Sequence, residues 1–263
     1  MARRAGTPAR RTDGANSTAD RAIDILLLFS SERPTWSAGD IATTFGMPRS
    51  TTYRYLNTLR SYALIVEDDH GGFRLGPRIL PLARAAKANL SVIKLAAPAM
   101  ASLAEEFGEL VVLHERVGSE IIPLERIESG HRVTIASTRS HLLPWPATGS
   151  AKILLAHAPE AERDQLLKMM KPVLYTDRTL RDKPSLLKAL EDIRRDGYAI
   201  TDEERDPGVW GIAAPIVSRS GVRHCVALAI PRFRVHEKRK VALIRSVQRA
   251  AAQIGEAVAA TEI

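Results

Sequence analysis

The chain has 263 residues, 45% of them hydrophobic and 26% charged, which are ordinary proportions for a globular protein with one large domain or two modest ones. Its single cysteine, Cys225, excludes an intrachain disulfide, and no run approaches the roughly 18 consecutive apolar residues of a membrane span. The formal net charge of +8 and the isoelectric point near 9.9 favour a polyanionic partner without identifying it.

The first residues of the chain carry a cluster of this positive charge. Four arginines lie among the first eleven residues of "MARRAGTPARRTDGANSTAD", and no apolar run follows them. This composition predicts a disordered basic arm over residues 1–16 and not a secretory signal peptide. We therefore expect a cytoplasmic protein.

Three short helices are predicted after the arm. The apolar spacing in "TADRAIDILLLFSSE" predicts a helix over about residues 19–31. In "SAGDIATTFG", Ser37 is the predicted N-cap of a second helix and Gly46 its end. A third helix is expected over about residues 48–62, because proline suits a first helical turn. Its buried face is expected to hold Thr52, Tyr55 or Leu56, Leu59 and Ala63.

The next segment, "LIVEDDHGGFRLG", has two short apolar pieces around a turn, which is typical of a β-hairpin. Three helices followed by a hairpin is the order of a winged helix-turn-helix, whose third helix enters the major groove of DNA. Hydroxyl, tyrosine and arginine side chains near the start of that helix suit contacts with bases and phosphates. Acids at 67–69 disfavour phosphate, so Arg74 is the expected contact from the wing. The predicted DNA-binding residues are Ser37, Arg49, Ser50, Thr51, Tyr53, Arg54 and Arg74. The alternative interpretation is a small helical core with solvated charges.

The remaining chain alternates between strands and helices. "LPLARAAKANLSVIKLAAPAMASLAEEFG" predicts a linker helix, broken by Pro98, that leads into a second domain. Strand pairs are expected in "ELVVLHERVGSEIIPLERIES" and "WGIAAPIVSRSGVRHCVALAIP", with a further strand in "HRVTIAS". Helices are expected in "ATGSAKILLAHA", "AERDQLLKMM", "KPSLLKALEDIRRDGYAI" and the amphipathic "HEKRKVALIRSVQRAAAQIGEAVAA". This order predicts an α+β sensor-type domain with a mixed antiparallel sheet.

Several of these segments together resemble the IclR family of bacterial transcriptional regulators. The resemblance covers about residues 17–259 and rests on "RAIDILLLF", "DIATTFGMPRSTTYRYLNTL", "FRLGPRILPLA", "ATGSAKILLA" and "GYAITDEERDPGVWGIAAPI". It implies the following fold and domain order. Residues 1–16 form the basic arm, residues 17–76 a winged helix-turn-helix DNA-binding domain, residues 77–90 a linker helix, and residues 91–263 a GAF-like α/β domain for effector binding and oligomerisation.

The resemblance also implies a function. A homodimer or homotetramer is expected to bind a palindromic operator in double-stranded DNA, of a catabolic operon, and to respond to a small organic effector held in a pocket on the sheet. Whether it activates or represses stays open. The implied effector-binding residues are Trp145, Thr148, Gly149, Ser150, Thr201, Asp202, Trp210, Gly211, Ala229 and Pro231.

The implied pocket departs from the pattern of relatives that bind small polar acids. Such relatives tend to carry Asp at the position of Thr201, Cys or Ser at that of Gly211, and Ser at those of Ala229 and Pro231. A buried carboxylate lacking these partners loses several hydrogen bonds, which is costly. Tryptophans at 145 and 210 offer apolar surface instead, which favours an aromatic acid.

The alternative function is an enzyme that processes small molecules and carries a DNA-binding appendage. No nucleophile elbow, phosphate-binding loop, dinucleotide fingerprint or zinc motif supports it, so no catalytic residue, cofactor or metal is predicted. The adjacent His224 and Cys225 lie in a predicted strand, where their side chains point to opposite faces. We therefore interpret Cys225 as a small buried apolar residue and not as a nucleophile.

Overall fold

The structure is a computed structural model that describes residues 18–30, 33–89, 91–135, 141–142 and 146–262. The chain divides into two compact units, Met1–Asn89 and Leu90–Ile263. Among the described residues, no helix is long and apolar enough to cross a membrane.

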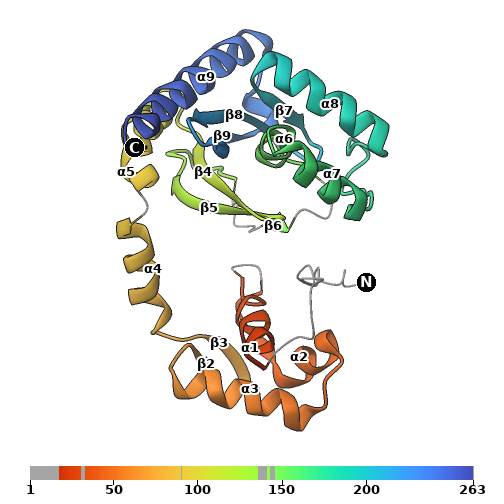
Figure 1. The fold of residues 1–263 in the computed structure, drawn as a ribbon. Helices are drawn as coiled ribbons and strands as arrows, with labels where there is room; N and C mark the ends of the chain where they lie inside the picture. The colour runs from red at the N-terminus through yellow and green to blue at the C-terminus, as the bar shows by residue number, and fades with distance from the viewer. Residues whose placement is uncertain (1–17, 31–32, 90, 136–140, 143–145, 263) are drawn as a thin grey trace. The chain divides into compact units, whose positions relative to one another are not determined.

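The first unit consists of three helices, a small sheet and a fourth helix (Figure 1). Its elements are α1 (Thr18–Leu26), β1 (Trp36–Ser37), α2 (Ala38–Phe45), α3 (Arg49–Ser61), β2 (Ile65–Glu67), β3 (Gly72–Leu75) and α4 (Ile79–Asn89). The three strands pair antiparallel in the order β1-β3-β2. Apolar residues of α1, α2, α3 and the strands form one core, with Ile25, Ile41, Leu56 and Phe73 at its centre.

The predicted helix ends are confirmed for α2, while the neighbouring helices differ in detail. The Ser37 hydroxyl accepts a hydrogen bond from the Asp40 N–H at 3.0 Å, and Gly46 ends α2 in the left-handed conformation that glycine adopts without strain. Pro48 is the N-cap of α3 and not its first residue. Helix α1 ends at Leu26, earlier than predicted, because Leu27 and Leu28 form a turn.

The predicted hairpin is confirmed, and an aspartate builds its turn. The Asp68 carboxylate accepts hydrogen bonds from the N–H groups of His70 and Gly72, at 2.9 and 2.8 Å. These two donors lower the pKa of Asp68 below its ordinary value. Gly72 keeps this turn free of crowding, because a Cβ at this position would lie 2.5 Å from the Thr35 methyl group, which would have to shift.

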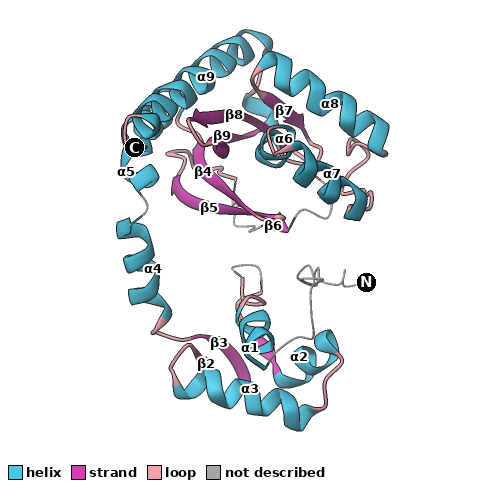
Figure 2. Cartoon of the chain, viewed as in Figure 1, coloured by secondary structure: helices cyan, strands magenta, loops and turns pink. Residues whose placement is uncertain are grey.

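The second unit is a six-stranded sheet between two layers of helices (Figure 2). Its elements are α5 (Ser91–Phe107), β4 (Leu110–Val117), β5 (Glu120–Ile127), β6 (His141–Leu142), α6 (Gly149–Ala156), α7 (Glu160–Met169), α8 (Lys183–Asp196), β7 (Ala199–Asp202), β8 (Val209–Ser218), β9 (Gly221–Pro231), the 3-10 turn η1 (Arg232–Arg234) and α9 (Glu237–Ala259). The strand order is β6-β5-β4-β9-β8-β7, and each described pairing is antiparallel. The predicted α+β class is confirmed.

The two faces of this sheet are covered by different helices (Figure 1). Alternate residues of β4, β8 and β9, such as Leu113, Trp210 and Val226, pack with α5 and α9. The residues between them along the same strands, such as Ala213 and Cys225, point to the other face and pack with α6, α7 and α8. This two-residue period decides which side chains are available to a site on either face.

Two predictions for the second unit were wrong, and one strand was not predicted. Pro98 lies inside α5 and does not break it, because the helix around it is held by buried Ala96, Met100 and Leu103. Residues 131–135 of "HRVTIAS" form no strand, and the Val133 carbonyl accepts hydrogen bonds from the Arg234 guanidinium instead. The last two residues of that motif lie outside the described residues. Strand β7, which follows Gly197, was missed.

Candidate functional site

Helix α3 presents a polar, acid-free face to solvent in the first unit. Ser50, Tyr53, Arg54 and Asn57 recur at helical spacing and are exposed, while Thr52, Tyr55, Leu56 and Leu59 fill the opposite, buried face. The predicted buried residues of α3 are thus confirmed except Ala63, which lies past the helix and is only partly buried. The exposed face has the shape and chemistry of a recognition helix.

Three more of the predicted DNA-binding residues lie at the start of α3 or just before α2. Arg49 is exposed at the first position of α3, and Thr51 beside it is partly buried. Ser37 is exposed, and its hydroxyl remains able to donate while its oxygen caps α2. Asn57 was not among the predicted residues, although its position seven residues after Ser50 places it on the same face.

The acids of the wing are largely occupied by contacts within the unit. Glu67 pairs with Arg60 of α3 at 2.6 Å, and Asp68 builds the hairpin turn. Arg74 is exposed on β3. The acids therefore repel phosphate less than the sequence alone indicated, and Arg74 stays available for contact.

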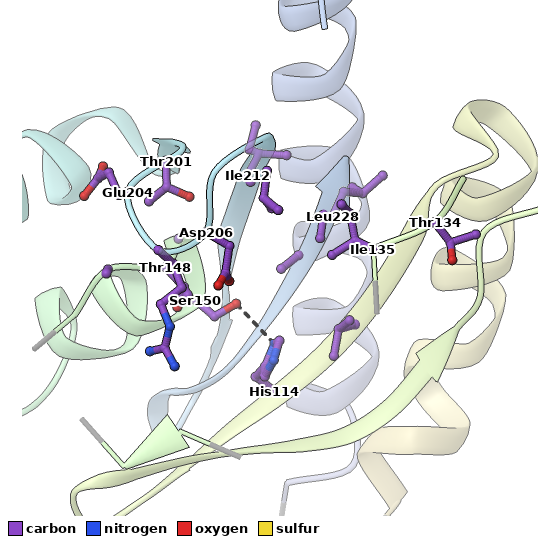
Figure 3. Close-up of a pocket in the computed structure, with 18 residues that line it drawn as sticks. His114, Thr134, Ile135, Thr148, Ser150, Thr201, Glu204, Asp206, Ile212 and Leu228 are labelled. Carbon is purple, nitrogen blue, oxygen red and sulfur yellow. Dashed lines mark hydrogen bonds between the residues drawn. The ribbon is translucent and has the colours of Figure 1, made fainter. Parts of the chain in front are cut away.

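The second unit contains a cavity of about 280 Å³ on the α6 face of its sheet (Figure 3). Small side chains of the central strands form its floor, among them Gly211, Ala227 and Ala229. A Cβ at Gly211 would lie 2.8 Å from the Thr201 hydroxyl, so glycine keeps this part of the floor open. Val112 adds apolar surface, and Ile212 and Leu228 also line the cavity although their side chains belong to the core against α5 and α9.

The start of α6 forms one polar wall of the cavity. The Thr148 hydroxyl caps the helix by accepting from the Ala151 N–H at 3.3 Å, and the next residues, Gly149 and Ser150, also line the cavity. The first N–H groups of a helix have no intrahelical partner and attract negative charge. This wall therefore suits an anionic or hydrogen-bond-accepting group.

A serine–histidine pair lies beside that wall. The Ser150 hydroxyl and His114 Nδ1 are 3.1 Å apart, and both residues line the cavity (Figure 3). Burial lowers the pKa of His114 to about 4, so the imidazole is neutral at pH 7. The neighbouring Cys225 is fully buried, as predicted, and burial raises the pKa of its thiol to about 12.

Charged groups enter the cavity from the loop between β7 and β8. Glu204 pairs with buried Lys152 of α6, with Nζ 2.6 Å from each carboxylate oxygen. Burial raises the pKa of Glu204 and lowers that of Lys152, while the pairing opposes both changes. Arg205 and Asp206 follow Glu204 along the cavity wall.

Strand parity separates the predicted effector-binding residues into two groups. Thr201, Gly211 and Ala229 line the cavity, as do Thr148, Gly149 and Ser150. Contrary to prediction, Trp210 does not: it neighbours Gly211 on β8 and its side chain is fully buried in the core against α5 and α9.

The other predicted residues also lie away from the cavity or outside the description. Asp202 neighbours Thr201 on β7, and its carboxylate accepts from Arg232 Nε at 2.7 Å. Pro231 ends β9 opposite Val209 and is not among the lining residues. Trp145 lies outside the described residues.

The cavity also contains residues that the sequence did not indicate. Neither His114 nor Arg205 was among the predicted effector-binding residues. Alternation from Val112 along β4 indicates that His114 shares its face, whereas nothing in the sequence separates Arg205 from an ordinary surface arginine. Over the part of the chain that is described, no three His, Cys, Asp or Glu side chains are grouped as a metal site would require.

A winged helix-turn-helix with an exposed α3, joined to an α+β unit with a cavity on its sheet, defines the class of ligand-sensing transcription factors. The model of the bacterial transcriptional regulator IclR C-terminal domain matches residues 84–256, and that of the IclR helix-turn-helix domain matches residues 18–69. The chain belongs to the IclR family of transcriptional regulators, and it is a regulator and not an enzyme.

Relatives of known name and structure agree with this family. The chain is 32% identical to the HTH-type transcriptional regulator TtgV of Pseudomonas putida over 241 residues, covering 90% of this chain and 91% of that protein. It is 30% identical to the HTH-type transcriptional repressor AllR of Escherichia coli, with 94% of each chain covered. A putative IclR regulator from a Silicibacter species has the same fold, with a TM-score of 0.82, 22% identity and coverage of 92% and 96%.

One further structural neighbour contains a bound ligand. It is an IclR homologue from Microbacterium hydrocarbonoxydans complexed with 4-hydroxybenzoate, with a TM-score of 0.77, 24% identity and coverage of 93% of this chain and 100% of that chain. At 24% sequence identity, this structural similarity shows that the two proteins share a fold.

Proposed function

We propose that this protein binds a palindromic operator through the α3 face and the wing, and that a small aromatic acid in the sheet cavity changes this binding. The observation that carries the proposal is the cavity itself, which combines apolar surface with the polar start of α6. A cavity of about 280 Å³ suits a single-ring compound more than a large hydrophobic ligand. The complex of the related fold with 4-hydroxybenzoate supports the same ligand class.

The proposed assembly is a homodimer or homotetramer, with residues 17–76 binding DNA, residues 77–90 linking, and residues 91–263 binding effector and forming subunit contacts. Leu80 and Leu82 of α4 are 60% and 56% exposed, and such apolar side chains suit contact with a second copy. A symmetric dimer binds two half-sites at fixed spacing, so an effector that favours another spacing of the winged units weakens or shifts operator binding. We also propose that the regulated genes belong to a catabolic operon.

The proposal is tested with the full chain in two steps. Selection from random double-stranded DNA should yield a palindromic sequence, and benzoate or 4-hydroxybenzoate should then change the affinity for that sequence. Ligand that binds only the folded state at a hundredfold excess over Kd adds about 2.7 kcal/mol of stability, which a thermal-shift assay detects.

The control is a variant that fills the cavity. Ala229→Phe, on the floor, should remove the thermal shift and leave DNA binding intact. An unchanged response in Ala229→Phe would place the effector elsewhere, and the absence of any selected sequence would exclude the operator-binding role.

A further inference from the structure

We propose that Arg205 binds the anionic group of the effector and restricts the effector to compounds with a single negative charge. This inference rests on the proposed function, because it assigns the ligand chemistry of the same cavity. The starting observation is that Arg205 lines the cavity with its Nε atom buried and without a hydrogen-bond partner.

Arg205 is unpaired among charged neighbours that are engaged. Glu204, which precedes it, is paired with Lys152, and Asp206, which follows it, also interacts with another residue. No hydrogen bond or ion pair joins Arg205 to any residue in the described ranges of the chain. A partly buried guanidinium without a partner relies on water, and a ligand that displaces this water must supply an acceptor in its place.

The side chain of Arg205 is held in position before any ligand arrives. Its guanidinium carbon lies 4.3 Å from the centroid of the Tyr175 ring, within the range of a cation–π contact. The Thr179 hydroxyl donates to the Glu204 carbonyl at 2.7 Å and accepts from the Tyr175 N–H at 3.0 Å. The loop that carries Arg205 and the backbone of Tyr175, whose ring supports the guanidinium, are therefore held by the same threonine, which reduces the entropy lost on binding.

The balance of charge selects a carboxylate over a phosphate. Arg205 is the unpaired cation of the described lining, and the Glu204 and Asp206 carboxylates flank it in sequence. A monoanion neutralises the guanidinium, whereas the second charge of a dianion finds no further unpaired cation in the described lining. His114 cannot compensate, because it is neutral at pH 7. A planar carboxylate also matches the two parallel N–H donors of arginine.

The test compares three single-ring probes of similar shape: benzoate, benzamide and phenyl phosphate. Calorimetry with the full chain should show benzoate binding about tenfold or more tightly than either of the others. Benzamide loses a charged hydrogen bond, and phenyl phosphate adds a charge that no cation of the described lining compensates. Arg205→Met should bind benzoate and benzamide with similar affinity, and Arg205→Lys should keep part of the preference. Arg178→Met is the matched control, since Arg178 pairs with Asp202 and Glu203 and does not line the cavity.

The outcomes separate this inference from the proposed function. Wild-type protein that binds benzamide as tightly as benzoate, with both lost in Ala229→Phe, retains the effector cavity and overturns the role of Arg205. A benzoate preference that persists in Arg205→Met overturns it as well. Failure of all three probes to bind the wild-type protein, with operator selection successful, overturns the aromatic-acid effector together with this inference.

Discussion

Lys152 and Glu204 form a buried ion pair that joins helix α6 to the loop between β7 and β8. The side chains are only 4% and 12% exposed, and Nζ lies 2.6 Å from both carboxylate oxygens. Removing one member leaves the other as an uncompensated buried charge. We therefore expect Lys152→Met to destabilise the second unit by about 3–5 kcal/mol in urea unfolding.

The control for that prediction is the double variant Lys152→Met/Glu204→Leu, in which no charge remains buried. It should recover most of the lost stability, since a well-packed apolar pair often replaces a buried ion pair without loss. Equal stability of the single and double variants would show that the pair is well hydrated in solution and that Glu204 faces water.

His114 gives the protein a specific sensitivity to acid. Its folded-state pKa of about 4 lies below the ordinary 6.5, so between these pH values the unfolded chain binds more protons than the folded chain. Stability should be unaffected by this group above pH 6.5 and should fall as pH decreases towards 4, by roughly 3 kcal/mol at most. Denaturant titrations at pH 7, 6 and 5 measure this slope.

Replacing His114 by Asn separates its contribution from those of other histidines. His157 and His224 also have pKa values lowered by burial, so a smaller slope should persist in the variant. An identical slope in wild type and His114→Asn would mean that the imidazole is protonated in the folded state at pH 5.

Recognition of the operator should depend on single side chains of the α3 face. Arg49→Ala and Asn57→Ala should each weaken specific binding by about 1–3 kcal/mol, as expected for a lost base contact, while non-specific binding changes less. Electrophoretic mobility shifts with the selected and scrambled DNA sequences distinguish specific from non-specific binding. Lys238→Ala, which removes one charge from α9 in the other unit, serves as the charge control. Wild-type affinity in Arg49→Ala would exclude it from the recognition surface.

Gly255 allows α9 to lie directly on β8. A Cβ there would be 2.5 Å from the Val217 carbonyl oxygen, whereas one at Gly39 in α2 would meet only ordinary contacts at 3.5 Å or more. Glycine to alanine in a helix normally stabilises by about 1 kcal/mol. Gly255→Ala should instead destabilise by about 1–3 kcal/mol, because the backbone of β8 cannot move away easily. Gly39→Ala is the comparison. Thermal unfolding should show a lower melting temperature for Gly255→Ala and a higher one for Gly39→Ala than for the wild-type protein.

Much of the fold is predictable from local pattern. Ser37, Gly46, Thr148 and Gly197 act at helix ends through backbone geometry and neighbouring N–H groups, so a sequence motif specifies them directly. Pro98 shows the limit of this approach. Its helix-breaking tendency is overcome by packing against residues far away in the sequence, including α9, and no local pattern reports such packing.

The lining of the cavity is less predictable, because it depends both on which face of the sheet each strand residue points to and on which charged side chains pair with each other. Trp210 and Gly211 were predicted to act together, yet adjacent strand residues point to opposite faces, so strict alternation alone would have excluded one of them. The role of Arg205 depends on what its neighbours contact. Its pattern in "DEERD" matches a solvated turn, and the sequence does not reveal that Glu204 pairs with Lys152 while Arg205 forms no ion pair within the described residues.

The floor of small residues has a consequence for how this protein family can diversify. Gly211, Ala227 and Ala229 project from strands whose opposite faces carry the main core. Enlarging Ala227 or Ala229 by one or two carbon atoms reduces the cavity on the face opposite the packing against α5 and α9, whereas a side chain at Gly211 requires Thr201 to shift. Ligand preference can therefore be altered in small steps, by natural variation or by directed evolution of a biosensor, while the scaffold and its DNA-binding unit stay intact.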